Sequence, residues 1–99
     1  MAYNIFAETN RKIKWEELNK RLVMNRLLEY VPMPGMGIDG GDALGISIPS
    51  KNIRNETWAE LKMAIEILGN EFQLDLYDMY YGEKIDSKFM VKLKENLFV

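Results

Sequence analysis

The chain contains neither cysteine nor histidine among its 99 residues. The absence of cysteine excludes disulfide bonds, thiolate zinc sites and cysteine nucleophiles. The absence of histidine removes the side chain that most often acts as a general base near neutral pH and most often binds a metal ion. Both absences argue against catalytic chemistry, so we predict a protein that is not an enzyme and that binds no cofactor and no metal.

The chain also lacks a long apolar run and a basic leader at its start. No stretch approaches the roughly 18 apolar residues of a transmembrane helix, and the first residues do not resemble a signal peptide. We therefore expect a cytoplasmic protein with no membrane partner. The length and an apolar fraction of 47% suffice for one hydrophobic core, which predicts a single globular domain over residues 1–99.

Acidic and basic residues are nearly balanced over the whole chain but not along it. The formal net charge is −2, which is not typical of a nucleic-acid-binding protein. The segment from Arg11 to Arg26 has six basic and two acidic residues, whereas the segment from Glu71 to Asp86 has five acidic residues and one basic residue. The sequence therefore predicts one basic and one acidic region, each a candidate contact surface.

Hydrophobic periodicity switches repeatedly between the strand and the helix pattern. Pro32 and Pro34 allow at most an edge strand around them, because proline cannot donate a hydrogen bond within a sheet. The predicted elements are strands at 3–8 and 43–49, an edge strand within 30–38, a strand from residue 72 onward, and helices at 14–29, 55–69 and 88–97.

This order of elements predicts an α+β protein with the split βαβ arrangement of the ferredoxin-like fold (βαββαβ). We expect an antiparallel sheet with helices on one face, followed by an additional C-terminal helix. In that fold the second and fourth strands form the edges of the sheet. The proline-containing segment falls on the second strand, in agreement with an edge position.

The boundary after residue 69 has two interpretations. Gly69-Asn70 is a typical helix stop, and apolar and polar residues alternate from Phe72 onward, which favours a new strand. In the alternative, the helix continues through Gly69 and takes up Phe72 and Met79 at helical spacing. A strand keeps the tyrosines that follow on a flat surface, whereas a helix spreads them around its axis.

Residues 35–40 match the pattern G-x-G-x-x-G. The dinucleotide-binding version needs a helix after the glycines, but here a predicted strand follows, so we interpret the glycines as hairpin turn residues. Asp39 and Asp42 flank Gly40 and Gly41 and are likewise typical of turns. RNA-binding domains of the RRM type have the predicted topology with aromatic and basic residues on the central strands, and residues 44–48 contain neither.

A tyrosine-rich acidic cluster follows the last predicted strand. Tyrosines supply large, rigid contact areas in protein interfaces, and acidic residues steer association toward a basic partner. An acidic edge strand also favours β-augmentation, in which a partner adds a strand to the sheet. The predicted partner-binding residues are Asp75, Tyr77, Asp78, Tyr80, Tyr81 and Glu83.

The segment Asp78-Met79-Tyr80-Tyr81-Gly82 resembles the acid-then-Tyr-Tyr motif with which nuclease-colicin immunity proteins hold their toxins. That motif ends in proline, has one more spacer residue and lies in all-helical proteins, so the resemblance is one of surface chemistry. It implies a small bacterial or phage protein that inhibits a basic effector, as an immunity or anti-defence protein does. The alternatives are a homodimer formed through an edge strand and nucleic-acid binding through the segment from Arg11 to Arg26.

Overall fold

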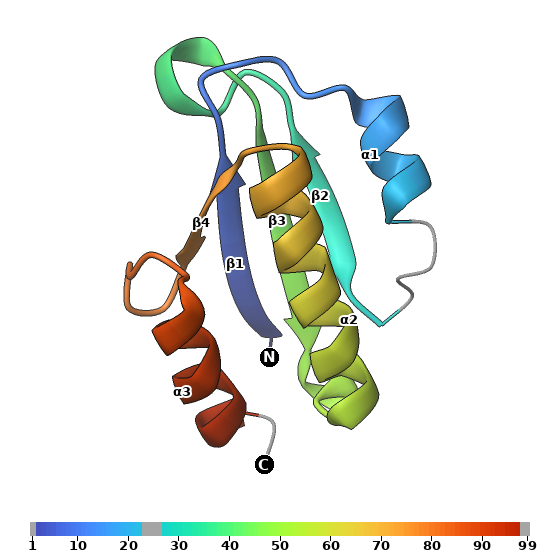
Figure 1. The fold of residues 1–99 in the computed structure, drawn as a ribbon, viewed down its shortest axis with the longest axis vertical. Helices are drawn as coiled ribbons and strands as arrows, with labels where there is room; N and C mark the ends of the chain where they lie inside the picture. The colour runs from blue at the N-terminus through green and yellow to red at the C-terminus, as the bar shows by residue number, and fades with distance from the viewer. Residues whose placement is uncertain (1, 23–26, 98–99) are drawn as a thin grey trace.

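A computed structural model describes residues 2–22 and 27–97 of the chain (Figure 1). Its strands are β1 (Ala2–Glu8), β2 (Glu29–Met33), β3 (Ala43–Pro49) and β4 (Asp75–Asp78). Its α-helices are α1 (Trp15–Arg21), α2 (Asn55–Glu66) and α3 (Ser87–Leu97). A π-helical turn, η3 (Ile67–Glu71), continues α2, and two short 3-10 turns, η1 (Ile38–Gly40) and η2 (Ser50–Asn52), flank β3.

The four strands form one antiparallel sheet in the order β2-β3-β1-β4. Ile5 of β1 lies opposite Ile46 of β3 on one side and opposite Asp78 of β4 on the other. The central strands are therefore β1 and β3, and the edges are β2 and β4. The predicted α+β class is confirmed, and the strand that contains Pro32 is an edge strand, as expected.

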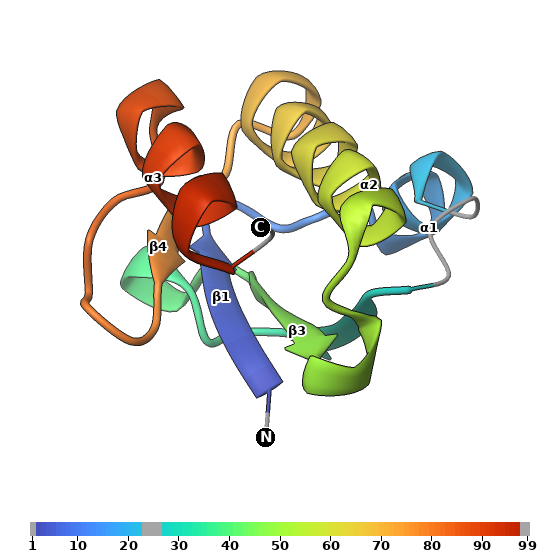
Figure 2. The same cartoon turned by 90° about the horizontal axis from the view of Figure 1, so that it is seen from below.

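The helices cover one face of the sheet (Figure 2). Ile5, Ala7, Ile46 and Ile48 point toward them and are fully buried, while Phe6, between Ile5 and Ala7, faces the other side and is half-buried. Burying a side chain such as Ile46 contributes about 1.5–3 kcal/mol. The helices complete the core with buried apolar side chains, namely Leu18 of α1, Leu61 and Ala64 of α2, and Phe89 and Leu93 of α3.

The first helix is shorter than the predicted helix at residues 14–29. It ends at Arg21, and Glu29 already belongs to β2, where it lies opposite Ser47. Residues 23–26 lie outside the described residues. Residues 29–33 pair with β3, which provides hydrogen-bond partners for their backbone. This pairing outweighs the helical spacing of the apolar side chains, because that spacing is only a local preference.

The second helix continues past Gly69, so the predicted stop is wrong. The chain stays helical to Glu71, with the Phe72 amide donating to the Ile67 carbonyl (3.3 Å). The helix then ends because Gln73 adopts a positive φ of 55° and the Leu74 amide turns back to the Leu68 carbonyl (2.9 Å). The strand interpretation holds from residue 75 onward, and the tyrosines therefore lie outside the helix.

The glycine-rich connection between β2 and β3 is packed against the chain that leaves β1. The Asp42 carboxylate accepts hydrogen bonds from the amides of Ile13 (2.7 Å) and Gly35 (2.9 Å), and these bonds hold its pKa below the usual value. A Cβ atom on Gly41 would lie 2.2 Å from the Thr9 carbonyl oxygen, so only glycine fits there. The glycines serve as turn residues, as predicted, and Asp42 ties the segment to Gly35 and to Ile13.

Candidate functional site

Strand β4 divides the predicted partner-binding residues between the two faces of the sheet. Asp75 and Tyr77 are half-buried and point to the face that carries no helix, where Tyr77 lies opposite Phe6 of β1. Leu76 and Asp78 point to the helix side and are buried. Alternation along a strand makes this division unavoidable, so the six predicted residues do not share one surface.

Asp78 is completely buried and its carboxylate is used inside the molecule. It accepts a hydrogen bond from the Tyr3 hydroxyl and another from the Tyr81 amide (2.6 Å). Burial, and then the bond to Asp78, raise the pKa of the Tyr3 hydroxyl far above its usual value. Asp78 thus fixes the start of the following loop to β1 and is not exposed to a partner.

The exposed tyrosines lie on the loop that follows β4, and residues 79–83 are called the tyrosine loop below. Met79, Tyr80 and Tyr81 are 59%, 79% and 68% exposed. The rings of Tyr80 and Tyr81 meet edge to face at 4.7 Å between centroids. The loop turns at Gly82, which has a positive φ of 72° and donates its amide to the Asp78 carbonyl (2.8 Å).

The outer edge of β4 is occupied by the chain itself. The Asp78 amide donates to the Glu83 carbonyl, and the Ile85 amide donates to the Leu76 carbonyl, both at 2.8 Å. Lys84, which lies between Glu83 and Ile85 in the sequence, forms a β-bridge with Tyr77. A partner strand cannot pair at this edge while residues 83–85 are in place, which leaves β2 as the open edge of the sheet.

The surface around the tyrosine loop is less acidic than the sequence suggests. Lys84 lies 3.5 Å from the Asp75 carboxylate, and Lys92 of α3 lies over the Tyr81 ring at 5.8 Å from its centroid. Glu71 pairs at 2.6 Å with Arg21 in the basic segment, and this hydrogen bond lowers the pKa of the Glu71 carboxyl. The predicted basic and acidic regions are therefore joined by an ion pair within the molecule, and these two charges are not both available to a partner.

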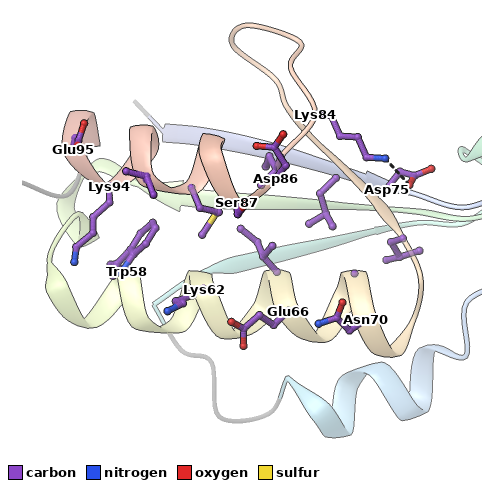
Figure 3. Close-up of a pocket in the computed structure, with 17 residues that line it drawn as sticks. Trp58, Lys62, Glu66, Asn70, Asp75, Lys84, Asp86, Ser87, Lys94 and Glu95 are labelled. Carbon is purple, nitrogen blue, oxygen red and sulfur yellow. Dashed lines mark ion pairs between the residues drawn. The ribbon is translucent and has the colours of Figure 1, made fainter.

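A groove of about 1180 Å³ separates α2 from α3 (Figure 3). Trp58, Lys62 and Lys94 lie at one end, and the Asp75–Lys84 ion pair lies at the other. The Lys94 ammonium is 5.8 Å from the centroid of the Trp58 ring. Sequence analysis missed this groove, because periodicity shows that each helix has an apolar face but not how far apart two helices lie.

The described residues contain no group of three or more acidic, histidine or cysteine side chains that could hold a metal ion. Among the described helices, none combines the length and the apolar character needed to cross a membrane. No protein-family model, curated protein or solved structure gives a significant match to this chain, so its own residues and geometry are the basis for a functional assignment.

Proposed function

We propose that this chain is a small, non-catalytic protein-binding module and that the tyrosine loop is its main contact surface. The observation that carries the proposal is the run of three consecutive, largely exposed side chains from Met79 to Tyr81. Large apolar side chains on a surface are ordinary when they are scattered, but a contiguous group indicates an interaction site. We also propose that the sheet is of the split βαβ, ferredoxin-like type, since β1 and β3 are its central strands.

Two hydrogen bonds to Asp78 shape the loop in the absence of a partner. The Asp78 carboxylate binds the Tyr81 amide, and the Gly82 amide closes the turn onto the Asp78 carbonyl. A preorganised loop loses little conformational entropy on binding, so more of the contact energy appears as affinity. Tyrosine is also among the residues most often found at interface hot spots, each of which contributes about 2 kcal/mol or more.

The partner we expect is a protein with a basic surface, and Glu83 is the exposed acidic residue of the loop that would face it. Inhibition of a basic effector, as by a cytoplasmic immunity or anti-defence protein of bacterial or phage origin, is the concrete form of this function. Lys92 beside Tyr81 limits the acidic character, so the affinity should depend more on the aromatic rings than on charge.

The test begins with co-purification of the tagged chain from its native cell and identification of the captured protein. Calorimetry with that protein should then show that Tyr80→Ala with Tyr81→Ala weakens binding by about 30-fold or more, as expected for a hot spot. Met36→Ala with Met63→Ala is the matched control, since both methionines are exposed elsewhere on the molecule. Equal loss of affinity in the two double variants would contradict the proposal.

A homodimer through β2 is the second candidate, because β2 is the open edge of the sheet and Val31 on it is 49% exposed. In this homodimer the β2 strands of two copies would pair across a two-fold axis, so the affinity between the copies would depend on β2. Sedimentation over a range of concentrations distinguishes the candidates, since a strict monomer is incompatible with the homodimer.

A further inference from the structure

The face of the sheet opposite the helices carries apolar and aromatic side chains from three of its four strands, in one row to which β3 contributes Gly45. Val31, Gly45, Phe6 and Tyr77 lie opposite one another in this order on β2, β3, β1 and β4. A Cβ atom on Gly45 would lie 3.2 Å from the Met33 Cε and 3.6 Å from the Val31 Cβ, which places both β2 side chains on this same face. We call this surface, residues 4, 6, 8, 29, 31, 33, 45, 47, 75 and 77, the open face.

The charges of the open face are almost all negative. Glu29 and Glu8 lie in the rows on either side of the apolar row, and Asp75 lies opposite Glu8. The basic residue at its margin, Lys84, is paired with Asp75. Figure 2 shows that α1, α2 and α3 all lie on the other side of the sheet, so none of these three helices covers this surface.

Charge complementarity decides between the molecules that could bind here. Aromatic side chains on a sheet can stack on nucleic-acid bases, but Glu8 and Glu29 would repel the phosphates. A second copy of the chain would add its own carboxylates to the same interface, and this excess of like charge costs affinity. A protein segment with apolar side chains and flanking lysine or arginine residues satisfies both the apolar row and the carboxylates.

We propose that the open face is a second binding surface and that it takes an extended, basic and apolar segment of a partner protein. The apolar side chains of the segment pack on Phe6, Tyr77 and Val31, and its cationic side chains reach Glu8 and Glu29. This surface does not depend on the tyrosine loop, because the loop residues Tyr80 and Tyr81 lie beyond the end of β4.

The test is an amide-shift titration by nuclear magnetic resonance with blocked heptapeptides. A peptide that alternates lysine and valine should shift the amides of Phe6, Gly45 and Tyr77 in a saturable way. A lysine–serine peptide should bind about ten-fold more weakly, because it lacks apolar side chains, and a glutamate–valine peptide should not bind. Equal binding of the lysine–valine and lysine–serine peptides would overturn the proposal, since charge alone would explain it.

Variants of the full chain locate the site. Glu8→Lys with Glu29→Lys should lower the affinity for the lysine–valine peptide by about ten-fold. Glu16→Lys with Glu95→Lys, on the helices, is the control and should change this affinity by less than about two-fold. Tyr80→Ala with Tyr81→Ala should leave peptide binding unchanged. Loss of binding in the tyrosine variant but not in the Glu8 and Glu29 variant would overturn this inference and leave the proposed function of the loop intact. Binding of a single-stranded oligonucleotide to the open face, or shifts confined to the α2–α3 groove, would also overturn it.

Discussion

Two aspartates with the same chemistry have different roles here because of the backbone around them. Asp75 is half-buried on the open face and pairs with Lys84, whereas Asp78 is buried and binds Tyr3 and Tyr81. A buried carboxylate is tolerated only when hydrogen bonds replace its lost hydration. The described residues leave no buried side-chain nitrogen or oxygen without a hydrogen-bond partner, which agrees with this rule.

Replacement of Tyr3 by phenylalanine removes one of the donors to the Asp78 carboxylate and should destabilise the fold. We expect Tyr3→Phe to cost about 1–2 kcal/mol, because a buried polar group loses a partner. This cost corresponds to a fall in the melting temperature of roughly 5–10 °C. Thermal denaturation checks it, with Tyr80→Phe as the control, since the Tyr80 side chain is 79% exposed. Equal melting temperatures for the two variants would show that the Tyr3–Asp78 bond contributes nothing.

Asp42 is the residue from which we expect the clearest pH dependence. Its pKa is lowered in the folded state, mainly by the hydrogen bonds from Gly35 and Ile13. A lowered folded-state pKa means that Asp42 stabilises the fold above the unfolded-state pKa of about 4, and that this contribution is lost as the pH falls through the folded-state value. The difference in melting temperature between the wild type and Asp42→Asn should therefore be largest near neutral pH and shrink as the pH falls below about 4. A difference in melting temperature that is the same near neutral pH and below about pH 4 would contradict this expectation.

At the scale of the elements, the end of the second helix shows how a local signal can be overridden. Gly69 and Asn70 are typical helix terminators, yet η3 includes both and the left-handed residue is Gln73. Ile67 and Leu68 are buried and Leu74 is buried just beyond the end. The helical residues beyond Gly69 and the turn at Gln73 bring Leu74 back beside Leu68 in the core, and this burial outweighs the preference of glycine for a helix end.

Gly69→Ala distinguishes the observed helix from the one predicted by the sequence. Within a helix, alanine is favoured over glycine by about 0.5–1 kcal/mol, so the free energy of unfolding should rise by roughly that amount. The new Cβ would lie 3.8 Å from the Leu76 Cδ1, which is an ordinary van der Waals contact. If Gly69 were instead a left-handed helix cap, alanine would lower the free energy of unfolding, and urea denaturation would show the opposite sign.

At the scale of the whole molecule, the two edges of the sheet differ. The outer side of β4 is closed by residues 83–85, and β2 remains open with Pro32 in it. Proline and a short length both make an edge strand a poor template for uncontrolled pairing. The chain thus leaves its aromatic surfaces available on the tyrosine loop and on the open face and limits pairing at its edges.

Hydrogen exchange can establish whether the edge at β4 stays closed in solution. The amides of Asp78 and Ile85 donate the two hydrogen bonds that close this edge, and the Lys84 amide takes part in neither bond. The amides of Asp78 and Ile85 should therefore exchange about ten-fold or more slowly than the Lys84 amide. Similar exchange rates at all three amides would mean that residues 83–85 leave β4 frequently. A partner could then add a strand at this edge, as the sequence first suggested.

Local patterns in the sequence were enough to predict the class of the fold and the positions of its central strands. Alternation predicted the strands β1 and β3, and Pro32 correctly indicated an edge strand. The candidate site was predicted less well, because Asp75, Tyr77 and Asp78 follow one another closely in the sequence but face different surroundings. Neither the groove between α2 and α3 nor the closure of β4 has a signature within a short segment.

The sequence by itself determined the absence of cysteine and histidine chemistry, the α+β class and the apolar side of each strand, since these depend on composition and short-range periodicity. Only the tertiary structure decided that Asp78 is buried, that helix α2 continues past Gly69, and that the sheet has an open face. These features depend on contacts between distant segments, such as that of Tyr3 with Asp78. Whether a residue is exposed is decided by what packs against it, and periodicity predicts an apolar side but not which distant segment covers it.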